Sequence, residues 1–198
     1  MKTFKNHLVI ASLLMAVCTP TAVMAESASD DTSPYSAAVN LDFQIDIPSV
    51  LNFRVGSAGG TIDLINFSPL AADVGNDNDV NGTGGDLTGG VVTVELFSNA
   101  GQVTITPTNS SGGAGLSDGG TNNIPYTEIL TSSNLAALGA PGLTNAGGTP
   151  TLPTETAGVT DLSAEWTYTY DNTAVYPAGT YGGVNTRGGR VTYTATAP

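Results

Sequence analysis

One acidic, glycine-rich stretch contains the residues whose spacing best fits a chemical role. Its oxygen-bearing side chains stand at alternate positions: Asp77, Asp79 and Asn81. Gly82 follows, as in the first half of a D-x-[DN]-x-[DN]-G calcium loop, in which alternate oxygens wrap a hard cation. The match ends there, because position twelve is Thr88 rather than Glu, so Asp86 or Asp73 would have to complete a site of another kind. We expect either a calcium site at Asp77, Asp79, Asn81 and Asp86 or ordinary turns, since Gly, Asn and Asp are also common turn residues.

The residues that usually perform catalysis are confined to the first 25 positions. Cys18 and His7 are the only residues of their types, and both lysines and all three methionines also lie there. From residue 26 onward, Ser-His-Asp, Cys-His and Ser-Lys arrangements are therefore excluded, and zinc and copper lose their usual ligands. A pair of carboxylates, as in glycosidases, is the one enzymatic arrangement left. The acidic residues lie mostly in Gly/Asn-rich loops, which favours a role in solubility, so we predict that the protein is not an enzyme.

The charge balance of residues 26–198 is strongly acidic. Three cations, Arg54, Arg187 and Arg190, stand against 17 acidic residues, a net charge of −14. Nucleic-acid binding depends on Lys and Arg that displace counterions from phosphates, and so acidic a chain would be repelled. An anionic membrane surface is disfavoured for the same reason. We therefore expect no nucleic-acid partner.

The N-terminus has the organisation of a secretory signal peptide. Lys2 and Lys5 precede an apolar stretch from Leu8 to Val17, which is too short to span a bilayer. Val23 and Ala25 supply the short residues that a signal peptidase requires at −3 and −1. We predict cleavage after Ala25, export, and no insertion into the membrane afterwards.

The rest of the chain has the periodicity of an all-β protein. After an acidic leader at residues 26–38, apolar and polar residues alternate over Val39–Ile47, a pattern typical of a strand with one buried face. Further strands are predicted at Ser49–Gly56, Thr61–Phe67, Gly90–Phe97, Gln102–Thr106, Ile124–Leu130, Leu162–Tyr170 and Arg190–Ala197. Ser132–Leu138 is the only stretch suited to a helical turn, and Leu143–Pro153 has the composition of a loop. We predict an antiparallel, immunoglobulin-like β-sandwich with long Gly/Asn-rich loops, formed as a single domain by residues 39–198.

The two ends of this domain carry a family resemblance. The alternating segment Val39–Ile47 ends at Pro48, and a P-x-G-x-Y-x-G sequence, Pro177–Gly183, precedes the last strand. This arrangement resembles chaperone–usher pilin subunits, particularly the cysteine-free α-type (class 5) fimbrial subunits. The likeness is confined mainly to the two ends. A weaker likeness links the closing run Tyr193–Pro198 to WxL-type surface domains.

The pilin resemblance implies a non-catalytic subunit of a surface fibre that functions in cell adhesion. It implies a donor strand that inserts into the next subunit through its apolar side chains: Val39, Leu41, Phe43, Ile45 and Ile47. It further implies that the last strand faces a chaperone or partner through Val191, Tyr193 and Ala195. The expected partners are copies of the chain or related subunits, a periplasmic chaperone and an usher. The expected location is the surface of a Gram-negative bacterium, reached through the periplasm.

A second interpretation stays open on the same residues. Val39–Ile47 can instead be the first strand of a complete sandwich that binds a glycan or a partner protein through its loops. Trp166, with Tyr168 and Tyr170, could then form an aromatic platform for a sugar. Tryptophan at an inward position of a sandwich strand is more often part of the core, however, and we favour that reading.

Overall fold

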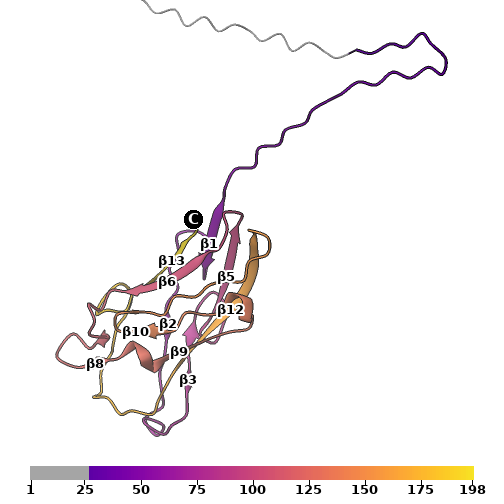
Figure 1. The fold of residues 1–198 in the computed structure, drawn as a ribbon. Coiled ribbons are helices and arrows are strands. Elements are labelled where there is room, and N and C mark those ends of the chain that lie inside the picture. The colour runs from indigo at the N-terminus through magenta and orange to yellow at the C-terminus, as the bar shows by residue number, and fades with distance from the viewer. Residues whose placement is uncertain (1–26) are drawn as a thin grey trace, which may run out of the picture. The chain divides into compact units, whose positions relative to one another are not determined.

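A computed structural model describes residues 27–198, and the predicted signal peptide and its cleavage site lie outside the described residues. The chain divides into two units, Met1–Asp46 and Ile47–Pro198. The described part of the first unit, residues 27–46, contains no helix or strand. The second unit is all-β, and its sheets are antiparallel (Figure 1).

The larger sheet has the strand order β1-β5-β12-β3, with β9 also paired to β12. Its members are β1 (Leu51–Val55), β3 (Val80–Asn81), β5 (Val91–Ser98), β9 (Ile129–Ser133) and β12 (Thr160–Tyr170). The second pairing that matters for function joins β6 (Thr104–Asn109) to β13 (Val191–Thr196). Three short hairpins complete the set: β2 (Ile65–Asn66) with β4 (Thr83–Gly84), β7 (Leu116–Ser117) with β8 (Asn123–Ile124), and β10 (Leu143–Thr144) with β11 (Gly147–Gly148).

The core gathers inward side chains of the larger sheet and of the β6–β13 pair. On β5 the alternating sequence buries Val92, Val94 and Leu96, and on β12 it buries Ala164, Trp166 and Tyr168. Val103 and Ile105, just before and within β6, join the same core. The alternating sequences of β5 and β12 thus bury one face of each strand, as predicted.

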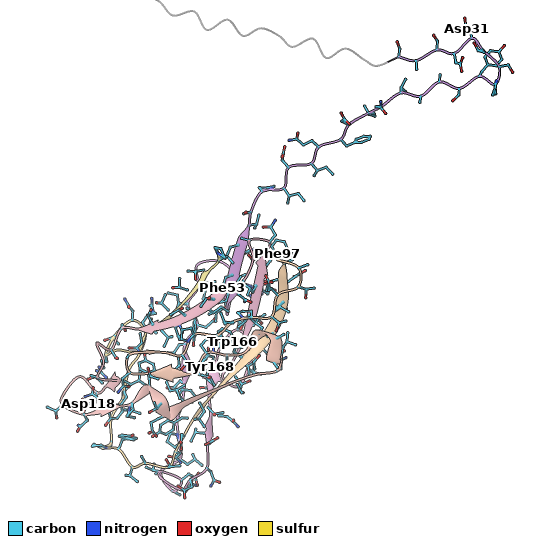
Figure 2. The ribbon with its side chains drawn as sticks, viewed as in Figure 1. Asp31, Phe53, Phe97, Asp118, Trp166 and Tyr168 are labelled. Atoms are coloured by element: carbon cyan, nitrogen blue, oxygen red, sulfur yellow. The ribbon has the colours of Figure 1, made fainter. Side chains whose placement is uncertain are left out.

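Trp166 lies at the centre of this core (Figure 2). Its Nε1 donates a hydrogen bond to the Leu138 carbonyl at 2.9 Å, and its ring makes an edge contact with Tyr193 at 5.3 Å between centroids. Leu138 is fully buried at the end of a 3-10 helix, Ala136–Leu138, which lies within the predicted helical turn; a second 3-10 helix, Tyr126–Glu128, was not predicted. Trp166 is thus a core residue and does not form an exposed sugar platform.

Several predicted elements differ from the observed ones. The strand predicted at Ile124–Leu130 is replaced by β8, a 3-10 helix at Tyr126–Glu128 and β9. Pro125 has no N–H for a ladder, and the Glu128 amide instead closes a turn onto its carbonyl. The strand predicted at Thr61–Phe67 shrinks to β2, and the loop predicted at Leu143–Pro153 contains the β10–β11 hairpin.

Candidate functional site

The first candidate feature is the apolar stripe of segment 39–47. Leu41, Phe43 and Ile45 have 76%, 86% and 83% of their surface exposed, and Val39 and Ile47 are also exposed. The polar residues between them include Gln44, whose Nε2 donates to the Asp46 carboxylate at 3.0 Å. The strand predicted here is not formed in the described chain, because alternation defines the two faces of a strand but does not by itself place it in a sheet. Segment 39–47 therefore has the alternating sequence of a strand but belongs to no sheet in the described chain.

The second feature is the open edge of β1. Within the described residues, β1 pairs only with β5. The Gly56 amide donates to the Thr93 carbonyl at 2.8 Å, and the Asn99 amide donates to the Val50 carbonyl at 3.2 Å. Hydrogen-bonded pairs alternate with non-hydrogen-bonded pairs in an antiparallel ladder, so the backbone groups left at the open edge belong to Leu51, Phe53 and Val55.

The last strand, β13, has an open edge of the same kind. In the described chain it pairs only with β6, and the Ser110 amide donates to the Arg190 carbonyl at 3.0 Å. The same alternation assigns the ladder bonds with β6 to Thr192, Thr194 and Thr196. The backbone groups at the open edge then belong to the three residues predicted to face a chaperone or partner: Val191, Tyr193 and Ala195.

The side chains at these two edges are apolar and incompletely buried. Phe53, Val55, Val191, Tyr193 and Ala195 are partly buried against the core, and Leu51 keeps 39% of its surface exposed. The inward residues of the central strand β5 differ, since Val94 and Leu96 are 0% and 1% exposed. The edges therefore leave both backbone groups and apolar surface available for a further strand.

The Tyr193 hydroxyl is 2.9 Å from that of Tyr168, in a pair that bridges β13 and β12. Burial raises the pKa of Tyr168 to about 12 and that of Tyr193 well above 10. Both phenols are consequently neutral at physiological pH. Tyr193, the one titratable side chain of β13, therefore adds no charge to the open edge.

Asn99 fixes the connection between segment 39–47 and β1. Its Nδ2 donates to the Pro48 carbonyl at 2.9 Å, and its Oδ1 accepts from the Val50 amide at 2.7 Å. This role of Asn99 has no local signal in the sequence, because the contact with Val50 spans 49 residues. Asn99 thereby holds Pro48 and Val50 beside the end of β5, directly before β1.

The predicted calcium residues are only partly brought together. Asp79 and Asn81 line a cavity of about 350 Å³ together with Asp73, Asn76 and Asn172. Asp77 adopts a positive φ of 61° in the adjoining turn and is not among the lining residues. Asp86 lies elsewhere, accepting the Thr93 amide at 2.8 Å. Residues 27–198 contain no group of three or more acidic, His or Cys side chains placed to hold a metal ion, and calcium binding stays a prediction.

The Pro177–Gly183 sequence forms a turn whose Tyr181 hydroxyl donates to the Pro177 carbonyl at 2.8 Å. The Gly182 amide donates to the Ser117 carbonyl at 2.9 Å and thereby ties the turn to β7. In the described part of the chain, no helix is long and apolar enough to cross a membrane.

Comparison with known proteins found no family model, no curated protein and no solved structure that matches this chain. The open edges and segment 39–47 therefore have to be interpreted from their own chemistry.

Proposed function

We propose that the chain is a non-catalytic structural subunit of a surface fibre that assembles by β-strand donation. Segment 39–47 of one copy adds to the open edge of β13 in the next copy, beside β1. In this proposal the second unit is an immunoglobulin-like sandwich that is short of one strand. The observation that supports it best is that one chain has both a fully alternating segment with exposed apolar side chains and two open strand edges.

The two parts are chemically complementary. An added strand would receive ladder hydrogen bonds from the open-edge backbone groups of Val191, Tyr193 and Ala195, and its alternate side chains would cover their half-buried neighbours. Burial of five apolar side chains contributes about 7–15 kcal/mol before the costs of ordering and association. The outward neighbours on β13 are exposed threonines, which suit the polar face of the segment with Asp42 and Asp46.

The connection to β1 favours a partner copy over the chain's own edges. Asn99 binds both Pro48 and Val50, so a hairpin turn back onto β1 would have to use residues of segment 39–47 and would shorten the strand it can add. Donation from one copy to the next is a head-to-tail contact that does not close on itself, and such contacts extend into fibres. Before assembly, the same edges would need cover, which is the role that the predicted periplasmic chaperone would fill.

The Ala195→Pro variant tests the acceptor edge. Proline removes the backbone N–H that faces the incoming strand, while the bonds to β6 are made by the neighbouring threonines and persist. We expect the variant to fold but to need at least about tenfold more protein to polymerise, which sedimentation velocity measures.

Ala195→Ser is the matched control, because it keeps the N–H at the same position and should polymerise like the unmodified chain. Far-UV circular dichroism of both variants checks that the sheets are intact. A folded Ala195→Pro chain that polymerises at the unmodified concentration would contradict donation at the β13 edge.

A further inference from the structure

The outer face of the larger sheet carries an exposed aromatic residue that neither the fold nor the proposed assembly uses. Phe97, labelled in Figure 2, is 42% exposed and lies in β5. Its neighbours Leu96 and Ser98 are buried on the opposite face of the strand. The register places Asn52 of β1 directly opposite Phe97 on one side and Asp161 of β12 on the other. Directly opposed side chains in a sheet have Cβ atoms about 5 Å apart, so both polar groups flank the ring.

Around Phe97 the sheet surface forms a shallow hollow of about 240 Å³. Its polar lining consists of Asn52, Glu95, Asp161 and Ser163. Within residues 27–198, Asn52, Asp161 and Ser163 make no side-chain hydrogen bond with another residue, so an amide, a carboxylate and a hydroxyl remain available to a ligand. The Glu95 carboxylate is already bound by Arg54, with 2.7 Å between Nη2 and Oε1.

The charge, size and polarity of the hollow indicate which class of ligand it can bind. It has no cation among its lining residues and two carboxylates, which disfavours an anionic ligand. It is lined by seven residues, far fewer than the roughly 20–30 residues per side of a stable protein interface. One apolar ring bordered by hydrogen-bonding groups matches a molecule with an apolar face and a rim of hydroxyls. We infer that this hollow binds a neutral pyranose sugar, stacked on Phe97 and hydrogen-bonded by Asn52 and Asp161.

This inference is independent of the proposed strand donation, because Phe97 points away from the core face that an added strand would cover. Binding through one ring and a few exposed hydrogen bonds should be weak, with a dissociation constant on the order of 1 mM. In a fibre of many subunits, several such weak sites can bind one multivalent glycan surface at once and so increase the overall affinity.

Saturation-transfer difference NMR with the full chain tests the site, and it tolerates polymeric protein. The probes are methyl β-glucopyranoside, methyl β-galactopyranoside and methyl α-mannopyranoside. We expect saturation transfer to at least one of them, about tenfold weaker binding in Phe97→Ala, and near-normal binding in Phe97→Tyr, which keeps a ring for stacking. Leu152→Ala, which truncates another exposed apolar residue, is the matched control and should bind normally.

Three results would overturn the inference. One is the absence of transfer to all three glycosides, and a second is transfer that Phe97→Ala retains in full. The third is a loss of self-association in Phe97→Ala without any sugar, which would make the hollow a contact between copies. Failure of strand donation in the Ala195 variants leaves this experiment unaffected, so the two proposals can fail separately.

Discussion

A chain that carries Phe43→Asp is expected to stay monomeric at concentrations at which the unmodified chain forms fibres. Phe43 is the most exposed of the five apolar residues of segment 39–47, and donation would bury it. The substitution removes about 1.5–3 kcal/mol of apolar burial and in addition forces a carboxylate into an apolar setting. A combined loss of at least about 3 kcal/mol corresponds to roughly a 150-fold weaker contact between copies.

Gln44→Asp is the matched control for this experiment. It introduces the same carboxylate one residue further along, on the polar face of the segment, where it would remain in solvent. Light scattering after size-exclusion chromatography and electron microscopy compare the two variants. Polymerisation by Phe43→Asp to the same extent as by Gln44→Asp would show that the apolar stripe does not form the contact.

The largest effect on folding is expected from Trp166→Ala. Trp166 is 0% exposed, and replacing a buried tryptophan by alanine typically costs about 3–5 kcal/mol. The Leu138 carbonyl also loses its hydrogen-bond donor, which adds to the cost. We expect the melting temperature to fall by about 10 °C or more, since 1 kcal/mol corresponds to about 2–4 °C in a chain of this size.

Far-UV circular dichroism has to follow this unfolding, because Trp166 is the only tryptophan and its replacement removes the fluorescent probe. Leu152→Ala serves as the control, since Leu152 is 67% exposed and its truncation should change stability little. A Trp166→Ala chain as stable as this control would contradict the assignment of Trp166 to the core.

The parts of the fold that the sequence predicts well are those with local signals. Alternation locates β5, β12 and β13 to within two residues at each end, and it places Trp166 on the inward face. At Ile124–Leu130 the sequence predicts a strand wrongly, because its apolar residues are compatible with either a strand or a turn. The burial of Tyr126, whose hydroxyl donates to the Gly188 carbonyl, decides for the turn. A contact of that range has no counterpart in local sequence.

The candidate site likewise has parts that local sequence predicts and parts that it does not. The apolar stripe of segment 39–47 is visible in the sequence, as are the apolar residues of the last strand. The open edges are not visible, because whether a strand has one neighbour or two depends on the topology of the whole sheet. Alternation along β5 places Phe97 on the outward face, but its neighbours Asn52 and Asp161 follow only from the register between strands and are not visible in the sequence.

Disulfide trapping between two populations of the chain is the most direct test of strand donation. Residues 26–198 contain no cysteine, so introduced pairs are free of background. One population carries Gln44→Cys, and the other carries Thr192→Cys, Thr194→Cys or Thr196→Cys on the exposed face of β13. Directly opposed residues of neighbouring strands have Cβ atoms about 4.5–5.5 Å apart, close to the roughly 3.5–4.5 Å that a disulfide spans.

Leu152→Cys in place of the β13 variants measures random encounter. Strand donation predicts that mixed polymers form a disulfide between Gln44→Cys and at least one β13 position, well above the Leu152→Cys level. Cross-linking of all three β13 positions at or below that level, in chains that still polymerise, would contradict the account.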